Sequence, residues 1–124
     1  MTGTRLRVSN IGDISEVNYT LDSARTDRIT VAYSDDDINW IYDRVDGRCF
    51  YCGMRLSFHN YGKVGERGAW EADHFYPVVS GGAHQPYNWV PACIDCNTRK
   101  SDHFPWEFDP ERFAHGDRNP DNYL

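Results

Sequence analysis

Residues 70–101 bring together side chains that can do chemistry on a phosphate group. The stretch reads WEADHFYPVVSGGAHQPYNWVPACIDCNTRKS, and it holds an adjacent Asp73 and His74, followed later by Asn97. A carboxylate and an amide oxygen suit a hard divalent cation such as Mg2+ or Mn2+. A neutral imidazole beside them can take a proton from water. These groups predict hydrolysis of a phosphodiester, with a metal ion to stabilise charge on its oxygens.

The four cysteines of the chain form two C-x-x-C pairs, Cys49/Cys52 and Cys93/Cys96. In tetrahedral zinc sites each such pair supplies two ligands, and four thiolates leave no position for a reactant. The sequence therefore predicts one structural Zn2+ whose binding is coupled to folding. The alternatives are two disulfides or a thioredoxin-like redox pair, which fit poorly with a leaderless chain lacking a βαβ pattern around its C-x-x-C.

Local patterns predict the elements that position these residues. Ser34 and the three aspartates after it are typical of a helix N-terminus. The helix is expected to run toward Gly47, with one apolar stripe made of Ile38, Ile41, Tyr42 and Val45. Further along, the sequence predicts a strand over 70–79, a turn at 81–82, a returning strand over 88–90 closed by Pro91, and a helix over 93–101.

Length and composition indicate one modest globular domain. The chain has 124 residues, of which 40% are hydrophobic and 26% are charged. We expect an N-terminal arm over 1–33 with short strands at 5–8 and 28–33, a core over 34–103, and a C-terminal tail over 104–124 with a short helix beginning at Asp109.

Charge and hydropathy limit the classes of partner that the chain is expected to bind. A net charge of -6 argues against a general nucleic-acid coat protein, but cations surround the cysteine and histidine segments, so net charge does not decide the partner. No apolar run approaches the ~20 residues that cross a bilayer, and the N-terminal sequence MTGTRLRVSN has no apolar signal region. The expected location is the cytoplasm, without a membrane partner.

The order DH, GG, N, VPAC and CxxCN followed by a cation resembles the HNH endonuclease family of the ββα-metal type. The resemblance covers about residues 48–102, less than half of the chain. The signature positions of the family fall on His74, Asn88 and Asn97, which is the His-Asn-Asn variant. The resemblance implies an α+β fold, namely a small ββα-metal nuclease domain with a structural four-cysteine zinc site and flanking helices.

By that resemblance, His74 is the general base that activates water, and Asp73 and Asn97 hold a single catalytic divalent cation, Mg2+ or Mn2+. Asn88 braces the loop that orients His74, and the products carry 5'-phosphate and 3'-hydroxyl ends. Strict alternation along a strand sends Asp73 and His74 to opposite faces, so the strand must end or twist there if both are to address one phosphate.

Four cations are candidates for contact with nucleic acid. Arg99 and Lys100 lie on the predicted site helix, whereas Lys63 and Arg67 lie in the long segment before Asp73, which equally fits a loop without a ligand.

The expected partner is double-stranded DNA, and pairing of two subunits through the N-terminal arm is a hypothesis. The settings that fit such a protein are restriction, phage DNA processing and toxicity. The alternatives to a DNA endonuclease are a non-catalytic zinc-stabilised nucleic-acid-binding module and a zinc-based protein-interaction domain.

Overall fold

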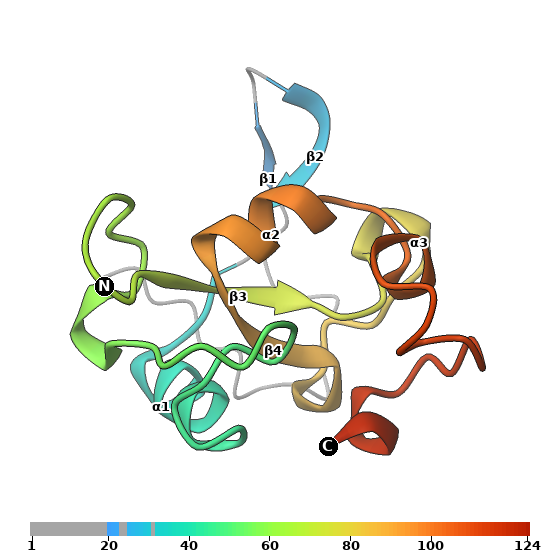
Figure 1. The fold of residues 1–124 in the computed structure, drawn as a ribbon. Helices are drawn as coiled ribbons and strands as arrows, with labels where there is room; N and C mark the ends of the chain where they lie inside the picture. Colours follow the sequence, from blue (N-terminus) through green and yellow to red (C-terminus); the bar gives the residue numbers. More distant parts are fainter. Residues whose placement is uncertain (1–19, 23–24, 31) are drawn as a thin grey trace.

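The centre of the molecule is an antiparallel hairpin followed directly by a helix. A computed structural model describes residues 20–22, 25–30 and 32–124, with side chains from residue 32 onward. The hairpin joins β3 (Trp70–His74) to β4 (Trp89–Cys93), and α2 (Ile94–Lys100) begins at the next residue (Figure 1). This order agrees with the strand, turn, strand and helix predicted from the sequence.

Strand β3 is shorter than expected, because it ends at His74 instead of continuing to residue 79. The ladder closes with His74 opposite Trp89, and the chain then turns through Pro77, which has no N–H to donate. Two single-turn 3-10 helices, η3 (Val78–Ser80) and η4 (Pro86–Asn88), form the connection back to β4. His74 therefore stands at the end of a strand.

Pro91 lies inside β4, opposite Ala72, and does not close the strand as expected. Proline is tolerated there because both strands of a two-stranded sheet are edge strands, so one side of β4 needs no N–H for pairing. The Pro91 carbonyl accepts a hydrogen bond from the Phe50 N–H at 2.8 Å. This bond fastens the segment of the first cysteine pair along β4.

Helix α1 (Asp35–Asp43) begins where the sequence predicts. The Asp37 N–H donates to the Ser34 hydroxyl at 3.0 Å, and the Ser34 N–H donates back to the Asp37 carboxylate at 2.9 Å. The helix ends a few residues before Gly47, because Asp46 turns left-handed (φ 53°) and the Gly47 N–H bonds to the Tyr42 carbonyl at 3.0 Å. This arrangement is a Schellman-type end, and it stops the helix.

The two longer helices pack against opposite faces of the hairpin. On one face, the ring of Tyr42 from α1 lies 5.5 Å from that of Trp70, and Trp89 shares this face because it pairs with His74. On the other face, Lys100 of α2 reaches Asp73 at 3.1 Å. Successive strand residues alternate between faces, so the helices are held by different side chains of β3.

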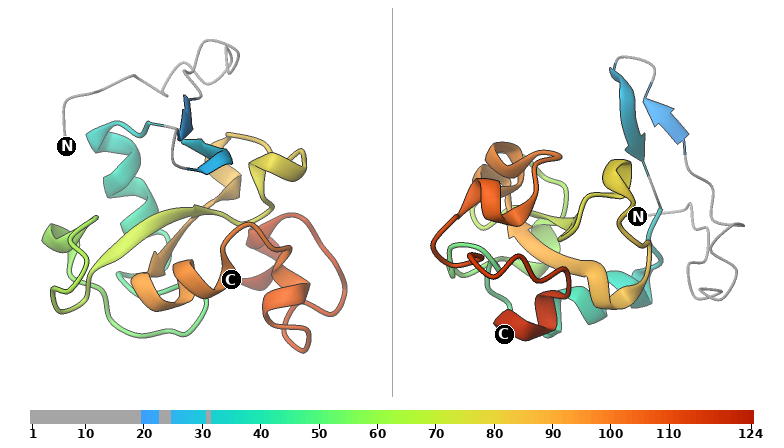
Figure 2. Two further views of the ribbon diagram at one scale, coloured as in Figure 1. Left: turned by 90° about the horizontal axis from the view of Figure 1, so that it is seen from above. Right: turned by 90° about the vertical axis from the view of Figure 1, so that its right-hand side faces the viewer.

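The N-terminal arm contributes a separate hairpin of β1 (Thr20–Asp22) and β2 (Arg25–Thr30). Strand β2 lies beside η3 and overlaps the strand expected over 28–33. In Figures 1 and 2 the hairpin projects from the body that holds β3, β4 and α2. The strand expected over 5–8 lies outside the described residues. No helix in the described part of the chain is long and apolar enough to cross a membrane.

The C-terminal tail folds back over the first cysteine pair. Helix α3 (Pro105–Phe108) and the 3-10 helix η5 (Pro120–Tyr123) flank a run of turns over 110–115, so the helix predicted from Asp109 is wrong. Tertiary contacts outweigh that local signal, because Arg112 donates to the Phe50 carbonyl at 2.6 Å and to the Tyr51 carbonyl at 3.2 Å. The remaining short element is the 3-10 helix η2 (Phe58–Asn60).

Substitution of Phe113 tests whether the C-terminal tail belongs to the core. Its side chain is fully buried and lies among the rings of Phe50, Phe75 and Tyr123. Phe113→Ala should lower the free energy of unfolding by about 3–5 kcal/mol, because a cavity forms where the ring was. Denaturant unfolding of the metal-loaded protein measures this change. Val64→Ala, at a side chain that is 71% exposed, is the control and should change stability by less than about 0.5 kcal/mol. Equal stability of the Phe113 variant and wild type would exclude the tail from the core.

Candidate active site

The four cysteines converge into one cluster. Their sulfur atoms all lie within 4.8 Å of one another, and Cys52 Sγ is 3.9 Å from Cys93 Sγ. All four are free thiols, so neither disulfide forms. A zinc–sulfur distance of about 2.3 Å sets sulfur–sulfur separations of about 3.8 Å in a tetrahedron. The cluster therefore has the donor set and the spacing to hold a metal ion such as zinc.

Backbone amides already point at these sulfurs. The N–H groups of Tyr51, Cys52 and Cys93 donate to Cys49 Sγ at 3.3–3.4 Å, and the Cys96 N–H donates to Cys93 Sγ at 3.4 Å. Such bonds stabilise thiolates and orient them around a metal. Local turns produce the bonds from Tyr51, Cys52 and Cys96, because each C-x-x-C folds so that later N–H groups face its first sulfur, whereas the bond from Cys93 to Cys49 joins the two pairs.

Burial and repulsion between neighbouring thiolates oppose ionisation of Cys49 and Cys96 in the absence of a cation. Burial raises the pKa of Cys49, and burial together with the charge of Cys49 raises the pKa of Cys96. At Cys52 burial acts in the same direction, but hydrogen bonds with the Met54 backbone and the neighbouring thiols outweigh it, so the pKa is lowered. A divalent cation removes the repulsion, so metal binding and thiol deprotonation are coupled.

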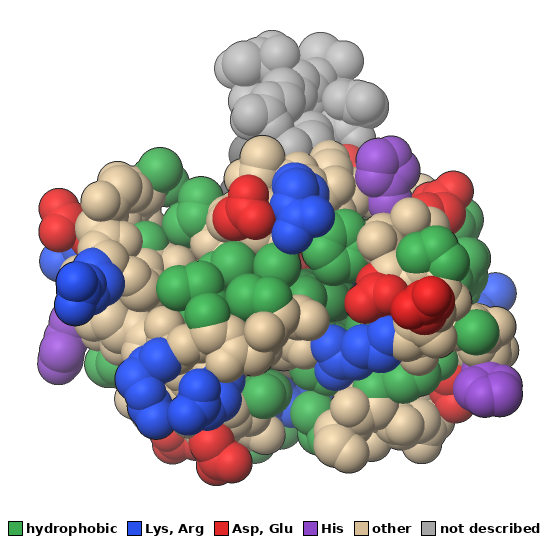
Figure 3. All heavy atoms as spheres, in the orientation of Figure 1, with side chains coloured by type: hydrophobic (Ala, Val, Ile, Leu, Met, Phe, Trp, Pro, Cys, Tyr) green, Lys and Arg blue, Asp and Glu red, His purple; other side chains and the backbone are tan. Residues whose placement is uncertain are grey.

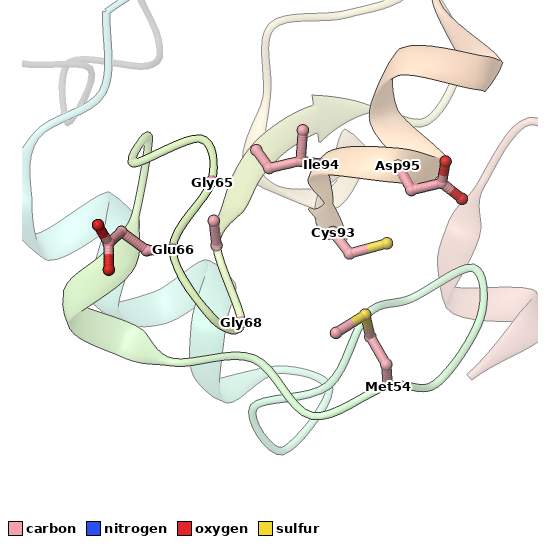
Figure 4. A pocket seen from close by; sticks show the side chains of 8 residues that line it. Met54, Gly65, Glu66, Gly68, Cys93, Ile94 and Asp95 are labelled. Carbon is pink, nitrogen blue, oxygen red and sulfur yellow. The ribbon is translucent and has the colours of Figure 1, made fainter.

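An open hollow lies beside this cluster and not at the Asp-His pair. Met54, the loop around Gly65 and Gly68, and the chain at Cys93 and Asp95 line it (Figure 4). Neither Asp73 nor His74 contributes to its walls.

Asp73 points toward α2 and is held by two donors. Its Oδ2 accepts from the Tyr51 hydroxyl at 2.5 Å and lies 3.1 Å from Lys100 Nζ, and that ammonium also donates to the His74 carbonyl at 3.1 Å. Burial raises the pKa of Asp73, while Lys100 and Tyr51 act in the opposite direction. Oδ1 accepts no hydrogen bond within the described residues, and a tenth of the side-chain surface is exposed. Oδ1 is therefore the oxygen atom of Asp73 that could bind a metal ion.

The ring of His74 lies on the other side of β3 and meets His84. His74 Nε2 and His84 Nδ1 are 2.9 Å apart, and the Trp89 indole N–H donates to the same His84 nitrogen at 3.3 Å. Burial, with smaller effects of charge at His84 and Lys100, lowers the pKa of His74 to about 3. Burial lowers the pKa of His84 to about 4, against an opposing effect of Asp37. Both rings are therefore neutral at pH 7, the form that can accept a proton.

Asn88 fastens the connection between the two strands. Its Oδ1 accepts from the Tyr76 N–H at 2.9 Å, and its Nδ2 donates to the carbonyls of Tyr76 and Ala83 at 3.0 and 2.9 Å. The connection passes so close to itself that a Cβ on Gly82 would lie 1.9 Å from the Tyr76 carbonyl oxygen. The buried side chain of Asn88 therefore determines the path of the backbone directly after His74.

Asn97 is placed by the second cysteine pair. It follows Cys96 in α2 and lies three residues before Lys100, so the two side chains share one face of the helix. Lys100 shows which way that face points, because its ammonium bonds to Asp73. Asp73 and Asn97 thus come from two packed elements, and their oxygen atoms fit the preferences of a hard divalent cation.

The four cations expected to contact nucleic acid differ in exposure. Lys100 is fully buried, so it is not a surface contact. Arg99 is exposed and pairs with Asp95 at 3.1 Å, and Lys63 and Arg67 are exposed in a loop that is closed by a hydrogen bond from Asn60 to the Arg67 carbonyl. On the face drawn in Figure 3, cationic side chains lie at several separate places and do not form one patch.

Sequence reasoning missed His84 and Tyr51. His84 follows Gly82 in the connection between two antiparallel strands, and the pairing of His74 with Trp89 brings both ends of that connection to the strand end where His74 stands. Tyr51 lies inside the first C-x-x-C, and the cysteine cluster draws that pair against β4 and α2. The signal that could have found them was the place of His84 in the hairpin connection and the place of Tyr51 inside a cysteine pair.

A hairpin followed at once by a helix, with an Asp-His pair at the end of the first strand and a four-cysteine cluster, defines a small α+β domain consistent with the ββα-metal fold. Residues 49–103 match the family model described as HNH endonuclease, so this segment is an HNH domain. The HNH family generally comprises nucleases. None of the curated proteins matches this chain.

The cysteine cluster predicts a metal-dependent fold. The purified chain should contain one zinc ion, and Cys93→Ser should lose it and unfold, because Cys93 ends β4 and caps α2. Elemental analysis and circular dichroism measure the two effects. Ser80→Ala, at an exposed residue outside the cluster, is the control. A Cys93→Ser protein that stays folded without metal would contradict the assignment.

The buried histidines predict an unusual titration. A lowered pKa favours the neutral ring, so the His74 and His84 side-chain NMR signals should stay constant between pH 8 and pH 5. An ordinary histidine, with a pKa of about 6.5, shifts through this range. Spectra of the zinc-loaded protein without other divalent metals make the measurement. A midpoint near pH 6.5 for either ring would contradict the burial described above.

Proposed function

We propose that this chain is a metal-dependent endonuclease that hydrolyses phosphodiester bonds of DNA, with His74 as the general base. The observation that carries the proposal is the HNH domain over 49–103, with a neutral histidine and a carboxylate at the end of β3 and an amide on α2, which packs against β3. A module that only binds nucleic acid has no need of a base and two oxygen ligands around one strand end.

Two metal sites have separate tasks in this proposal. The four cysteines hold a structural Zn2+, because a closed thiolate set leaves no position for substrate. Asp73 and Asn97 would hold a single Mg2+ or Mn2+. Bound there, this cation would stabilise the charge that develops on the phosphoryl and leaving oxygens.

The side chains of the protein perform the proton transfer and the positioning. His74 takes a proton from a water molecule while the water oxygen forms a bond to phosphorus. The bond from phosphorus to the 3' oxygen breaks, and that oxygen takes a proton from solvent. The products carry a 5'-phosphate and a 3'-hydroxyl. Asn88 supports this step by fixing the connection after His74, through its three buried hydrogen bonds.

The cations divide between positioning and substrate contact. Lys100 is buried against Asp73 and the His74 carbonyl, so we assign it to holding these two residues in register. Arg99, Lys63 and Arg67 are exposed and are assigned to the phosphate backbone of double-stranded DNA. Since Asp73 and His74 point to opposite sides of β3, the reacting phosphate lies across the end of that strand.

Cleavage of supercoiled plasmid tests the proposal. Zinc-loaded wild type should nick the plasmid when Mg2+ or Mn2+ is added, and His74→Ala should lower the rate by about 10²- to 10⁴-fold, the usual contribution of a general base. Gel electrophoresis over time gives the rate. His115→Ala, which removes an exposed histidine, is the control and should nick like wild type.

A failure to nick the plasmid would point to the alternative function. Folded, zinc-loaded wild type that binds the plasmid but does not nick it with either metal would favour a nucleic-acid-binding module without catalysis. Nicking by His74→Ala at the wild-type rate would remove His74 from the mechanism while leaving a nuclease.

A further inference from the structure

His84 makes the closest polar contact to the ring of His74. The two nitrogens, His74 Nε2 and His84 Nδ1, are 2.9 Å apart, and the ring centroids are 5.1 Å apart at 47°. The other nitrogen, His74 Nδ1, has no hydrogen bond within the described residues, and the side chain is only partly buried. The two nitrogens of His74 therefore have different surroundings.

A third group decides which nitrogen carries the proton. The Trp89 indole N–H points at the same His84 Nδ1, at 3.3 Å. An indole nitrogen is only a donor, so His84 Nδ1 must be an acceptor. The proton between the two histidines then belongs to His74 Nε2. A neutral imidazole carries one ring proton, so the lone pair of His74 is on Nδ1.

The rings of His74 and His84 are packed against other residues on several sides. His84 is 1% exposed, and the ring of Tyr33 lies 5.5 Å from His84 and 6.2 Å from His74. Trp89 is paired with His74 across the hairpin, and Asn88 holds the connection that carries His84 through its bond to the Ala83 carbonyl. A separation of 2.9 Å between the two ring nitrogens is that of an ordinary hydrogen bond, in which one nitrogen donates and the other accepts.

We propose that His84 is a positioning residue of the nuclease reaction, which holds His74 in the tautomer with its proton on Nε2 and directs Nδ1 toward the attacking water. The inference rests on the proposed function for its role in catalysis, whereas the tautomer itself is a property of the protein without substrate. His84 neither gives nor receives a proton during the reaction.

The first test reads the tautomer directly. Nitrogen-15 NMR of the histidine rings in zinc-loaded wild type, without Mg2+ or Mn2+ and without DNA, should show a protonated Nε2 and an unprotonated Nδ1 at His74. Trp89→Phe removes the indole N–H and keeps an aromatic ring, so the His74 and His84 tautomers should become mixed. A wild-type His74 with its proton on Nδ1 would overturn the inference whether or not the protein cleaves DNA.

The second test separates positioning from folding. His84→Leu keeps the bulk of the side chain without an acceptor, whereas His84→Asn places an amide oxygen where Nδ1 was. In plasmid nicking, His84→Leu should lower kcat by about 10- to 100-fold with little change in KM, below the full loss of the base, and His84→Asn should recover much of it. His59→Leu, at an exposed histidine, is the matched control.

The outcomes distinguish this inference from the proposed function. Zinc content and thermal unfolding identify variants that fail to fold, and the wild-type NMR measurement depends on no variant. If His74→Ala abolishes nicking but folded His84→Leu nicks like wild type, the nuclease assignment stands and the role of His84 is wrong. If wild type does not nick, the proposed function fails, and the NMR result still decides the tautomer.

Discussion

The convergence of four cysteine sulfurs within 4.8 Å is the constraint on which the rest of the site depends. Cys93 is both the last residue of β4 and the N-cap of α2, so fixing its sulfur fixes the angle at which the helix leaves the hairpin. The first pair is drawn against β4 at the same time, which brings Tyr51 to Asp73. A metal in this cluster therefore organises groups that it never touches.

The buried pair of Lys100 and Asp73 extends that constraint to the end of β3. A buried ion pair is seldom a net source of stability, because desolvation of two charges offsets their attraction. The ion pair between Lys100 and Asp73 instead fixes the positions of the groups around it. One ammonium bonds to the Asp73 carboxylate and to the His74 carbonyl, so α2 holds the backbone of both residues. The result is a strand end whose backbone, together with the Asp73 carboxylate, is fastened to the helix.

The site is built on two faces of one strand. Asp73 and Asn97 belong to the face covered by α2, and His74 with His84 belongs to the face that also carries Trp89. A strand that continued past His74 would separate these faces by its own backbone. Because β3 stops at His74, the backbone no longer separates the two faces beyond that residue, and the connection that Asn88 fastens begins there.

The sequence alone determined the start of α1, the order of strand, strand and helix, and the two C-x-x-C pairs, because capping, hydrophobic patterning and C-x-x-C spacing are local properties. The resemblance to HNH nucleases also predicted a common site for Asp73, His74, Asn88 and Asn97, and that grouping stays a prediction. The tertiary structure decided what depends on packing between distant segments: the burial of Lys100, the contact of His84 with His74, and the turns after Asp109 in place of a helix. These features arise from side chains that meet only after folding, and no local pattern carries that information.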